Sequence, residues 1–524
     1  MWTYDLAREQ VASLDVLRRL CDLSVEAGYN AFGLYLEHRF AYPSVPWSHG
    51  VGCLTPEMVR TLQEEYPALQ IVPFINLLGH FEGFLYTEAG RGNAEMPFKG
   101  MQACPSKPEF VDLANRILDD TLQIFSSPLV HIGGDETDHL GGCPRCKERV
   151  AEFEIEEGVD GKAKLYGEHF APLLAKVTAA GRRPAIWGDM LLAHPQAISI
   201  LPKETLIFDW EYFQSCSDTS KVFRSAGLDV VYCPTLHVYN ATWLHLPQSE
   251  RNVRENAIAA DKEEAHGLCL TTWECGLFGN YETLLPAIRA TGEMFSRSAE
   301  LAAEGPSEEL PYRELREAPS FLKGYLKEGE TYEEWARLTG VELQDAGGPF
   351  AFGGIRSGLK CRLLLYSNPF LCWMRHRDEL CGPSGDKALE IFERGIVFAP
   401  DASARGVSDF GKAVIQFVRF AEEAHQEYSA GNPGSAITAL APCRQIFDNL
   451  GKIARSNHLR IGGSLADIER CQVAKEHVER VVRRIKQYGD GSLGYLPSFE
   501  MITHPNFMPH DQGAWWLIND WARE

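Results

Sequence analysis

Residues 130–137 have the sequence Val130-His131-Ile132-Gly133-Gly134-Asp135-Glu136-Thr137, in which a short apolar strand ends in two glycines and two adjacent carboxylates. Glycines at a strand end allow backbone and ligand to approach closely. In a barrel of parallel strands, the active site lies at the carboxyl ends of the strands. This segment therefore predicts a buried strand that carries a functional site. A solvated acidic turn is the alternative.

Similar apolar runs occur on both sides of this segment, and helix-like stretches separate them. The eight runs, in chain order, are residues 2–7, 30–36, 69–77, 128–134, 184–189, 205–211, 229–234 and 267–273. Nearly continuous apolar runs are typical of parallel strands that are buried on both faces. Eight such units in this length predict a (β/α)8 TIM barrel. A doubly wound open sheet is the alternative, but no G-x-G-x-x-G follows the first run.

The pattern changes after about residue 295, where Gly-Pro and Gly-Gly pairs interrupt the chain. Helical periodicity then dominates, most clearly over residues 402–428, 435–453 and 463–488. We therefore predict a TIM-barrel domain over residues 1–295 and a mostly α-helical C-terminal domain over residues 296–524.

The charge balance limits the classes of partner. The chain has 51 Lys and Arg against 72 Asp and Glu, a formal net charge of −21. An acidic surface of this kind repels nucleic acid and anionic lipid, so we expect neither as a partner. The N-terminal residues lack the features of a signal peptide, and 14 cysteines without an export signal indicate reduced thiols. We predict a cytoplasmic protein, with a homodimer as one open alternative for its assembly.

The hexapeptide His131–Glu136 resembles the signature of glycoside hydrolase family 20, the β-N-acetylhexosaminidases. Asp5-Leu6-Ala7-Arg8 is similar to an Asp-x-x-Arg sugar-binding motif of that family. Residues 73–80, Pro-Phe-Ile-Asn-Leu-Leu-Gly-His, resemble Pro-Glu-Ile-Asp-x-Pro-Gly-His, with Phe74, Asn76 and Leu78 as departures. Glu37-His38-Arg39-Phe40 resembles a variant found in sequences without the family's small N-terminal domain. The resemblance covers about residues 1–290.

The resemblance implies a retaining exo-glycosidase that uses the substrate's own acetamido group as nucleophile. Glu136 would act as general acid and then as general base. Asp135 would hold the acetamido N–H, and Tyr239, or alternatively Tyr232, would donate to the acetamido oxygen. The other residues that the resemblance assigns to substrate binding are Asp5, Arg8, Glu37, His80, His131, Trp187, Trp210, Trp273 and Glu274. The implied substrate is a glycan with a terminal β-linked GlcNAc or GalNAc, and catalysis needs no cofactor.

Two other functions stay open. The first is a catalytically silent carbohydrate-binding barrel, which would have no need of the acidic pair. The second is a retaining glycosidase with a carboxylate nucleophile of its own. Such an enzyme would have no need of Trp187, Trp210 and Trp273, which end predicted strands five, six and eight, where the family has its acetamido pocket.

A metal site is a separate possibility. Cys143-Pro-Arg-Cys146 follows the acidic pair, and Cys53 and Cys104 fall in predicted loops on the same face of the barrel. Four thiolates form a closed tetrahedral Zn²⁺ site in many proteins, so a structural Zn²⁺ is one interpretation of the four cysteines. Four unconnected thiols are the alternative. No helix is predicted to start inside the C-x-x-C, which disfavours a redox role.

Overall fold

The computed structural model describes residues 1–7, 11, 13–50, 52–96, 99–237, 243–273, 280–304, 330–351, 361, 364–365, 377–463 and 465–489. These residues form two compact units. The first comprises the described residues within Met1–Leu236, Gln248–Trp273 and Ala287–Glu309. The second comprises those within His237–Pro247, Glu274–Pro286 and Leu310–Glu524. The division differs from a single boundary at residue 295, because two short segments from the predicted barrel region group with the helical residues.

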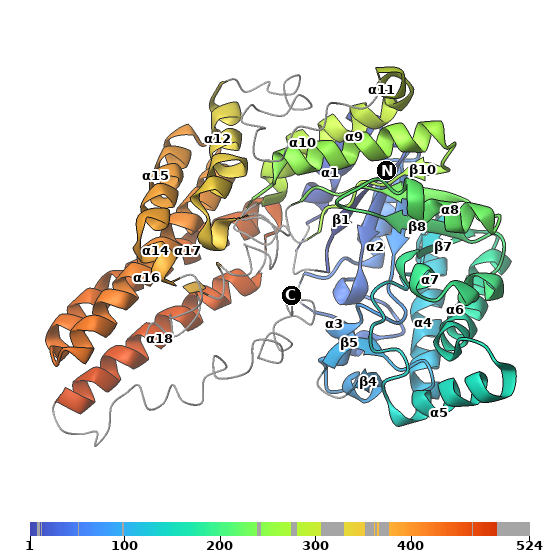
Figure 1. Ribbon diagram of the computed structural model, residues 1–524, viewed down its shortest axis with the longest axis horizontal. Helices are drawn as coiled ribbons and strands as arrows, with labels where there is room; N and C mark the ends of the chain where they lie inside the picture. Colours follow the sequence, from blue (N-terminus) through green and yellow to red (C-terminus); the bar gives the residue numbers. More distant parts are fainter. Residues whose placement is uncertain are drawn as a thin grey trace. The chain divides into compact units, whose positions relative to one another are not determined.

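The first unit is built on one parallel sheet of eight strands (Figure 1). In their order around the sheet, the strands are β1 (Trp2–Asp5), β2 (Ala31–Tyr35), β3 (Gln70–Phe74), β6 (Leu129–His131), β7 (Arg183–Trp187), β8 (Leu206–Trp210), β9 (Val230–Cys233) and β10 (Gly267–Leu268). Each of the eight predicted runs overlaps one of these strands, and only β7 extends beyond its run, by one residue. A parallel bridge between Trp2 and Leu270 joins the last strand to the first. The prediction of a TIM barrel is confirmed.

The apolar runs form parallel strands because both faces of the sheet are buried. All residues of β2 and β9 are buried. Alternate residues of several strands form one core cluster, which includes Phe74, Trp187 and Phe208. The helices outside the strands carry an apolar face, as in α4 (Pro108–Ile124), where eight residues are buried. The other helices that begin before residue 297 are α1 (Leu14–Glu26), α2 (Pro56–Glu65), α3 (Glu82–Leu85), α5 (Pro144–Glu152), α6 (Gly161–Ala179), α7 (Asp189–Ala193), α8 (Ser217–Ser225), α9 (Leu246–Lys262) and α10 (Asn280–Ser296).

A short antiparallel pair of strands that we did not predict lies in the segment between β3 and α4. It consists of β4 (Ala94–Met96) and β5 (Lys99–Ala103). Two backbone hydrogen bonds join β5 and its preceding loop, from Phe81 N to Met101 O at 3.0 Å and from Ala103 N to Leu78 O at 3.0 Å. The pair therefore supports the loop that follows β3.

The remaining helices confirm the prediction of a mostly helical C-terminal region. They are α11 (Ser298–Glu304), α12 (Glu330–Gly340), α14 (Arg377–Cys381), α15 (Pro383–Phe398), α16 (Ala402–Ser429), α17 (Pro433–Ile461) and α18 (Leu465–Gly489). The last three match the three predicted helices. Side chains from α15 to α18 share one apolar core. No helix in the described ranges combines the length and the apolar character that crossing a membrane requires.

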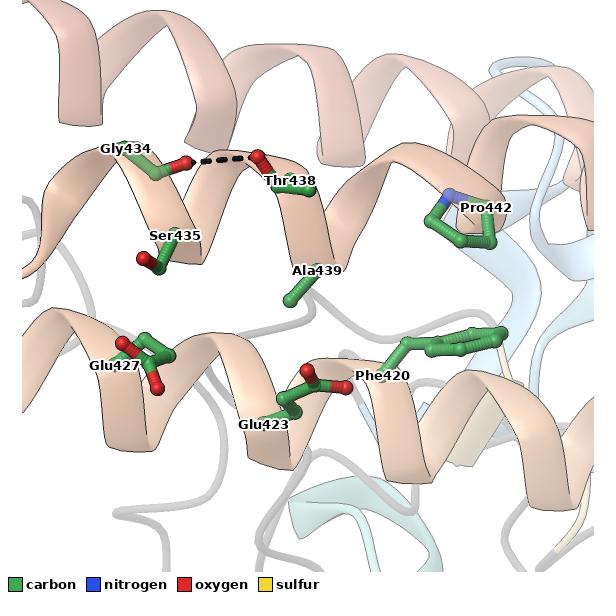
Figure 2. Close-up of a pocket in the computed structure, with 8 residues that line it drawn as sticks. All are labelled: Phe420, Glu423, Glu427, Gly434, Ser435, Thr438, Ala439 and Pro442. Carbon is green, nitrogen blue, oxygen red and sulfur yellow. Dashed lines mark hydrogen bonds between the residues drawn. The ribbon is translucent and has the colours of Figure 1, made fainter.

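A pocket of about 720 Å³ lies between α16 and α17 (Figure 2). Glu423 and Glu427 supply its acidic side chains, and Phe420 and Pro442 close one end. None of the predicted site residues lines it. The predicted site residues that the structure describes lie instead in the first unit, and several of them follow the carboxyl ends of the barrel strands.

Candidate active site

The loops after β3 and β6 bring three ionisable side chains together. The Nε2 atom of His80 lies 3.1 Å from Oε2 of Glu136 and 3.3 Å from Oδ2 of Asp135. The side chains of His80 and Asp135 are 5% and 10% exposed, whereas that of Glu136 is 38% exposed. Of these three groups, Glu136 is therefore the one most accessible to a ligand. Two of the three are the predicted catalytic carboxylates, and the third is a predicted substrate-binding residue.

Backbone strain is concentrated at the same place. Among the described residues, four that are not glycine have a positive φ, and three of them are Glu37 at 40°, His80 at 46° and Glu136 at 44°. They follow β2, β3 and β6 respectively. A side chain in this region of φ costs energy, and such residues persist where the surrounding structure holds them. The strain thus gathers on the residues that carry the candidate chemistry.

The glycines of the motif allow the backbone to pass through crowded space. Gly133 has a φ of 80°, and a Cβ atom there would lie 2.4 Å from Oδ1 of Asn76. Gly134 has a φ of 100°, and its Cβ would lie 2.5 Å from the hydroxyl oxygen of Tyr166. Only glycine combines these angles with this lack of space. The two glycines therefore place Asp135 and Glu136 against the loop after β3.

His80 is held in a strongly negative environment. Burial alone lowers its pKa, but the Tyr35 hydroxyl and the Asp135 and Glu136 carboxylates act in the opposite direction, so that its pKa lies well above the ordinary value. Glu82 approaches the other ring nitrogen, with 3.9 Å between His80 Nδ1 and Oε1 of Glu82. The imidazole therefore carries a positive charge between carboxylates at neutral pH.

Asp189, which the sequence did not indicate, binds the backbone of Glu136. The backbone N–H of Glu136 donates to Oδ2 of Asp189 at 2.9 Å. Burial, together with the nearby charges of Asp135 and Glu136, raises the pKa of Asp189 well above its ordinary value. Asp189 follows β7 by two residues, so its position at a strand end was the available signal.

His131 lies inside the barrel, which corrects the prediction that it contacts the substrate. Its ring is fully buried and stacks on Phe74 with a centroid distance of 4.5 Å, and it also contacts Trp187 and Phe208. Its Nδ1 accepts a hydrogen bond from the backbone N–H of Gly133 at 3.1 Å. Burial lowers the pKa of His131 well below its ordinary value, so the ring is neutral. We assign it a packing role beneath the glycines.

Aromatic side chains gather at the ends of β7 and β8 and in the segment that follows β10. Trp187 and Trp273 meet edge to face with 5.9 Å between their centroids. The indole N–H of Trp273 donates to the hydroxyl of Tyr212 at 2.6 Å, and Tyr212 stacks on Trp210 at 5.0 Å. The structure thus connects the three predicted tryptophans through contacts with one another or with Tyr212. Tyr212, two residues beyond β8, is a further residue that the sequence analysis missed.

The remaining predicted substrate-binding residues have different outcomes. Asp5 and Glu37 are buried at the ends of β1 and β2, and Glu37 lies close to His80 and Glu82. Arg8, Tyr239 and Glu274 lie outside the described residues. Tyr232, the alternative to Tyr239, is unsuitable.

The hydroxyl of Tyr232 explains this correction. It lies 2.6 Å from Ser220 Oγ on α8 and donates to Oε2 of Glu263 at 2.6 Å. Its neighbours Val231 and Cys233 belong to the cluster inside the barrel. Because side chains alternate along a strand, Tyr232 points to the helices and away from the strand-end site.

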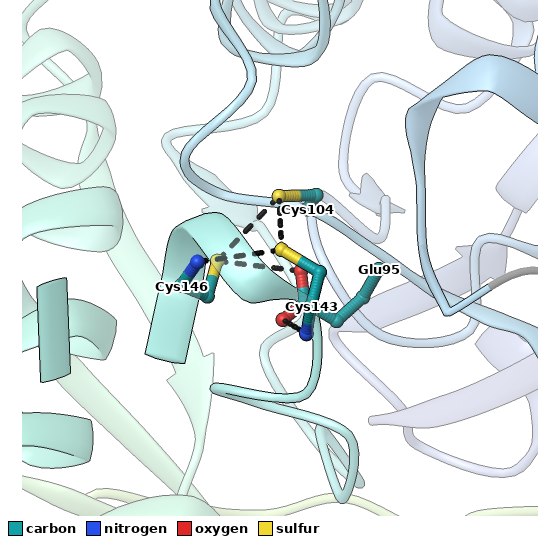
Figure 3. A group of neighbouring side chains, drawn as sticks. All are labelled: Glu95, Cys104, Cys143 and Cys146. Atoms are coloured by element: carbon teal, nitrogen blue, oxygen red, sulfur yellow. Dashed lines mark hydrogen bonds between the residues drawn. The ribbon is translucent and has the colours of Figure 1, made fainter. Parts of the chain in front are cut away.

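The structure places three of the four predicted metal ligands together and replaces the fourth. Cys104, Cys143 and Cys146 lie with Glu95 in one group (Figure 3). Cys53 is not part of this group, because its sulfur contacts Gly50 N at 3.1 Å and the His38 carbonyl oxygen at 3.7 Å. The helix α5 also begins at Pro144, inside the C-x-x-C, contrary to the sequence-based expectation.

A charged histidine between two carboxylates at the strand ends of a parallel barrel is suited to acid–base chemistry on a bound substrate. Residues 67–273 match the family described as "Glycosyl hydrolase family 20, catalytic domain". This match agrees with the family that the motifs predicted. The matched segment includes His80, Asp135, Glu136 and the three tryptophans.

Individual relatives are similar to parts of this chain. A β-hexosaminidase of Akkermansia muciniphila is 29% identical over 140 residues, which cover 26% of this chain and 26% of the relative. β-Hexosaminidase A of Caenorhabditis elegans is 24% identical over 200 residues, 34% of this chain and 36% of the relative. The crystal structure of a β-N-acetylhexosaminidase from Bacteroides fragilis is 17% identical, with a TM-score of 0.45 over 58% of this chain and 71% of that one. The matches to the curated relatives thus span only part of their length.

Proposed function

We propose that this protein is a retaining exo-β-N-acetylhexosaminidase that removes terminal β-linked GlcNAc or GalNAc by substrate-assisted catalysis. The observation that carries the proposal is the contact of one imidazole nitrogen, His80 Nε2, with both Asp135 and Glu136. In this scheme the acetamido oxygen of the substrate attacks its own anomeric carbon, so the protein supplies an acid and a charge stabiliser but no nucleophile.

Glu136 is assigned the proton transfers. It protonates the leaving glycosidic oxygen in the first step and takes a proton from water in the second. Its carboxylate is more exposed than those of its neighbours and contacts His80, whose positive charge stabilises the carboxylate once it has given up its proton. Asp189 fixes the backbone of Glu136 and so limits the positions that its carboxylate can take.

Asp135 is assigned the stabilisation of the oxazolinium ion. A buried carboxylate develops a strong interaction with positive charge because little water screens it. The contact with His80 fixes one oxygen of the Asp135 carboxylate. The carboxylate can then accept a hydrogen bond from the acetamido N–H of the substrate. Trp187, Trp210 and Trp273 supply the apolar surface against which an acetamido methyl packs.

The experiment that tests the proposal compares three aryl β-glycosides, those of GlcNAc, GalNAc and glucose, under the same conditions. Hydrolysis of one or both acetamido sugars with no hydrolysis of the glucoside supports it. Hydrolysis of all three favours a carboxylate nucleophile within the protein, since that mechanism does not need the acetamido group. Binding without turnover indicates a carbohydrate-binding barrel.

We further propose a cytoplasmic location, on the basis of the number of thiols. Cell fractionation tests this proposal. The homodimer is likewise a prediction, and light scattering of the purified protein in solution distinguishes it from a monomer.

A further inference from the structure

Four side chains with metal-binding atoms meet where the β4–β5 pair approaches the start of α5 (Figure 3). Glu95 lies on β4, Cys104 directly follows β5, and Cys143 and Cys146 flank the first residues of α5. The sulfur of Cys104 lies 3.5 Å from each of the other two sulfurs, and Cys146 Sγ lies 3.3 Å from Oε2 of Glu95. All four ligand atoms lie within 4.8 Å of one another.

The spacing fits a four-coordinate Zn²⁺. A Zn–S bond of about 2.3 Å in a tetrahedron separates two sulfurs by roughly 3.8 Å, and a carboxylate oxygen at about 2.1 Å lies roughly 3.6 Å from each sulfur. The separations of 3.5 Å between sulfurs and 3.3 Å between sulfur and oxygen need only small movements to reach these values. Three thiolates and one carboxylate complete a closed site.

The burial of these groups also favours a cation. Cys104 and Cys146 are fully buried and Glu95 is 1% exposed. In the part of the chain that the structure describes, Glu95 forms no ion pair with Lys, Arg or His; its hydrogen-bond partners are the backbone N–H of Cys143 and the thiol of Cys146. A carboxylate buried in this way is unfavourable unless positive charge is present. A divalent ion supplies that charge.

Further hydrogen bonds orient the ligands. The backbone N–H of Cys143 donates to Oε1 of Glu95 at 2.9 Å, and that of Cys146 to the sulfur of Cys143 at 3.3 Å. Ser106 Oγ lies 3.0 Å from Cys146 Sγ and accepts from Nη1 of Arg149 at 2.9 Å. Groups around a metal site commonly fix its ligands in this way, and Arg149 reduces the excess negative charge.

We propose that Glu95, Cys104, Cys143 and Cys146 bind one structural Zn²⁺, which fastens the β4–β5 pair to the segment that follows β6. The proposal is independent of the glycosidase activity. It extends the predicted thiol site by exchanging Cys53 for a carboxylate that the sequence did not indicate.

The position of the ion gives it a role in holding the candidate active site. The β4–β5 pair bonds to the loop that carries His80, through Phe81 N and Met101 O. On the other side, the backbone N–H of His139 donates to Oε1 of Gln102 on β5 at 2.9 Å, three residues beyond Glu136. The Zn²⁺ would therefore stabilise the connection, through the β4–β5 pair, between the loop that carries His80 and the loop that carries Glu136.

The first measurement is the metal content of the purified full-length protein. We expect about one Zn²⁺ per chain. C146S and E95A should lose most of the metal, while the control C53S should keep it, because Cys53 is a thiol in a neighbouring loop outside the group. Removal of the ion by a chelator should lower the melting temperature of the wild type and of C53S, and Zn²⁺ should restore it.

A second measurement works on the wild type and does not depend on how well the variants fold. Replacement of Zn²⁺ by Co²⁺ should give the thiolate-to-cobalt absorption and the intense visible bands of a tetrahedral site. A metal-free protein with an unchanged melting temperature would overturn the proposal. So would an intramolecular disulfide among Cys104, Cys143 and Cys146 in protein purified without reductant, which would indicate a redox site, or equal loss of metal from C53S and C146S.

Discussion

His80 and Glu136 lie on different loops, yet His80 Nε2 is 3.1 Å from Glu136 Oε2, and both residues have a strained, positive φ. The approach of the two loops depends on Gly79, where a Cβ atom would lie 2.3 Å from the carbonyl oxygen of Asp135. The close approach of the two loops thus accounts both for the contact between His80 and Glu136 and for their positive φ angles. The roles of the two carboxylates, the residues that position them and the substrate-assisted mechanism can each be tested separately.

Glu136→Gln should lower kcat on a disaccharide substrate by roughly 10²–10⁴-fold, the usual contribution of general acid–base catalysis. Aryl substrates with good leaving groups should suffer less in the first step, because their leaving oxygen needs no proton. Asp138→Asn is a matched control, since Asp138 is an exposed carboxylate two residues away. Full turnover of a disaccharide by the Glu136→Gln variant would remove Glu136 from the mechanism.

Asp135→Asn should lower kcat more than it raises KM, because the charge that Asp135 stabilises develops only on the way to the transition state. Steady-state kinetics on an aryl N-acetylhexosaminide measures both constants. Circular dichroism checks that the fold is unchanged. A variant with normal kcat and a raised KM would show instead that Asp135 contributes uniform binding.

Asp189→Asn should change how stability depends on pH. The raised pKa of Asp189 means that the folded state binds a proton that the unfolded state has released. Stability therefore falls as pH rises from about 4 towards the folded-state pKa, by at most about 1.4 kcal/mol per pH unit. The asparagine variant lacks this contribution, and its amide oxygen can still accept from the Glu136 N–H.

The difference in melting temperature between Asp189→Asn and the wild type should accordingly shift in favour of the variant as pH rises from about 4 towards the folded-state pKa of Asp189. Thermal melts in a series of buffers of constant ionic strength measure it. Parallel curves for the two proteins would mean that Asp189 is ionised in the folded state and that its pKa is not raised.

Gly133→Ala should destabilise the protein more than Gly181→Ala. Both glycines have a positive φ, 80° and 74°, but a Cβ at Gly181 meets nothing within 4 Å, whereas one at Gly133 meets the side chain and the backbone of Asn76. The free-energy cost of placing alanine at a positive φ, on the order of 1 kcal/mol, is common to both variants. Overpacking adds roughly 1–3 kcal/mol at Gly133 alone. Equal unfolding midpoints in urea would contradict the crowding that the structure indicates.

The barrel could be predicted from the sequence because its strands are short apolar runs at regular spacing, and burial on both faces requires that pattern. The acidic pair could be predicted because it follows one of these runs directly. Asp189 and Tyr212 follow β7 and β8 in the same way, and the same signal would have found them. Their contacts with Glu136 and Trp273 depend on how neighbouring loops turn, which no local pattern encodes.

The errors have similar physical reasons. Tyr232 was an alternative for the acetamide contact, although strand alternation with Val231 and Cys233 already directs it outward. The motif predicts a substrate contact for His131, but the position of His131 within β6 puts its ring in the barrel interior. The predicted loop position of Cys53 is the only feature that groups it with the other thiols. Glu95 was missed because residues 94–103 lack the alternation that predicts a pair of strands.

A thiazoline mimic of the bicyclic oxazoline should inhibit the enzyme competitively, with an inhibition constant well below the KM of the substrate. If the acetamido group is the nucleophile, the active site is complementary to a fused five-membered ring on the sugar. Asp135 would contact the ring nitrogen, and the methyl group would pack on the tryptophan surface formed by Trp187 and Trp273. An enzyme with a carboxylate nucleophile has no comparable affinity for that ring, and a 2-fluoro glycoside would label it covalently.

Both reagents can be applied to the wild type and monitored by inhibition kinetics and intact-mass spectrometry. Covalent labelling by the 2-fluoro glycoside together with indifference to the thiazoline would overturn the substrate-assisted mechanism. Since His80 holds both carboxylates of the pair, we expect the opposite result, with tight thiazoline inhibition that Asp135→Asn weakens and the exposed control Asp138→Asn leaves unchanged.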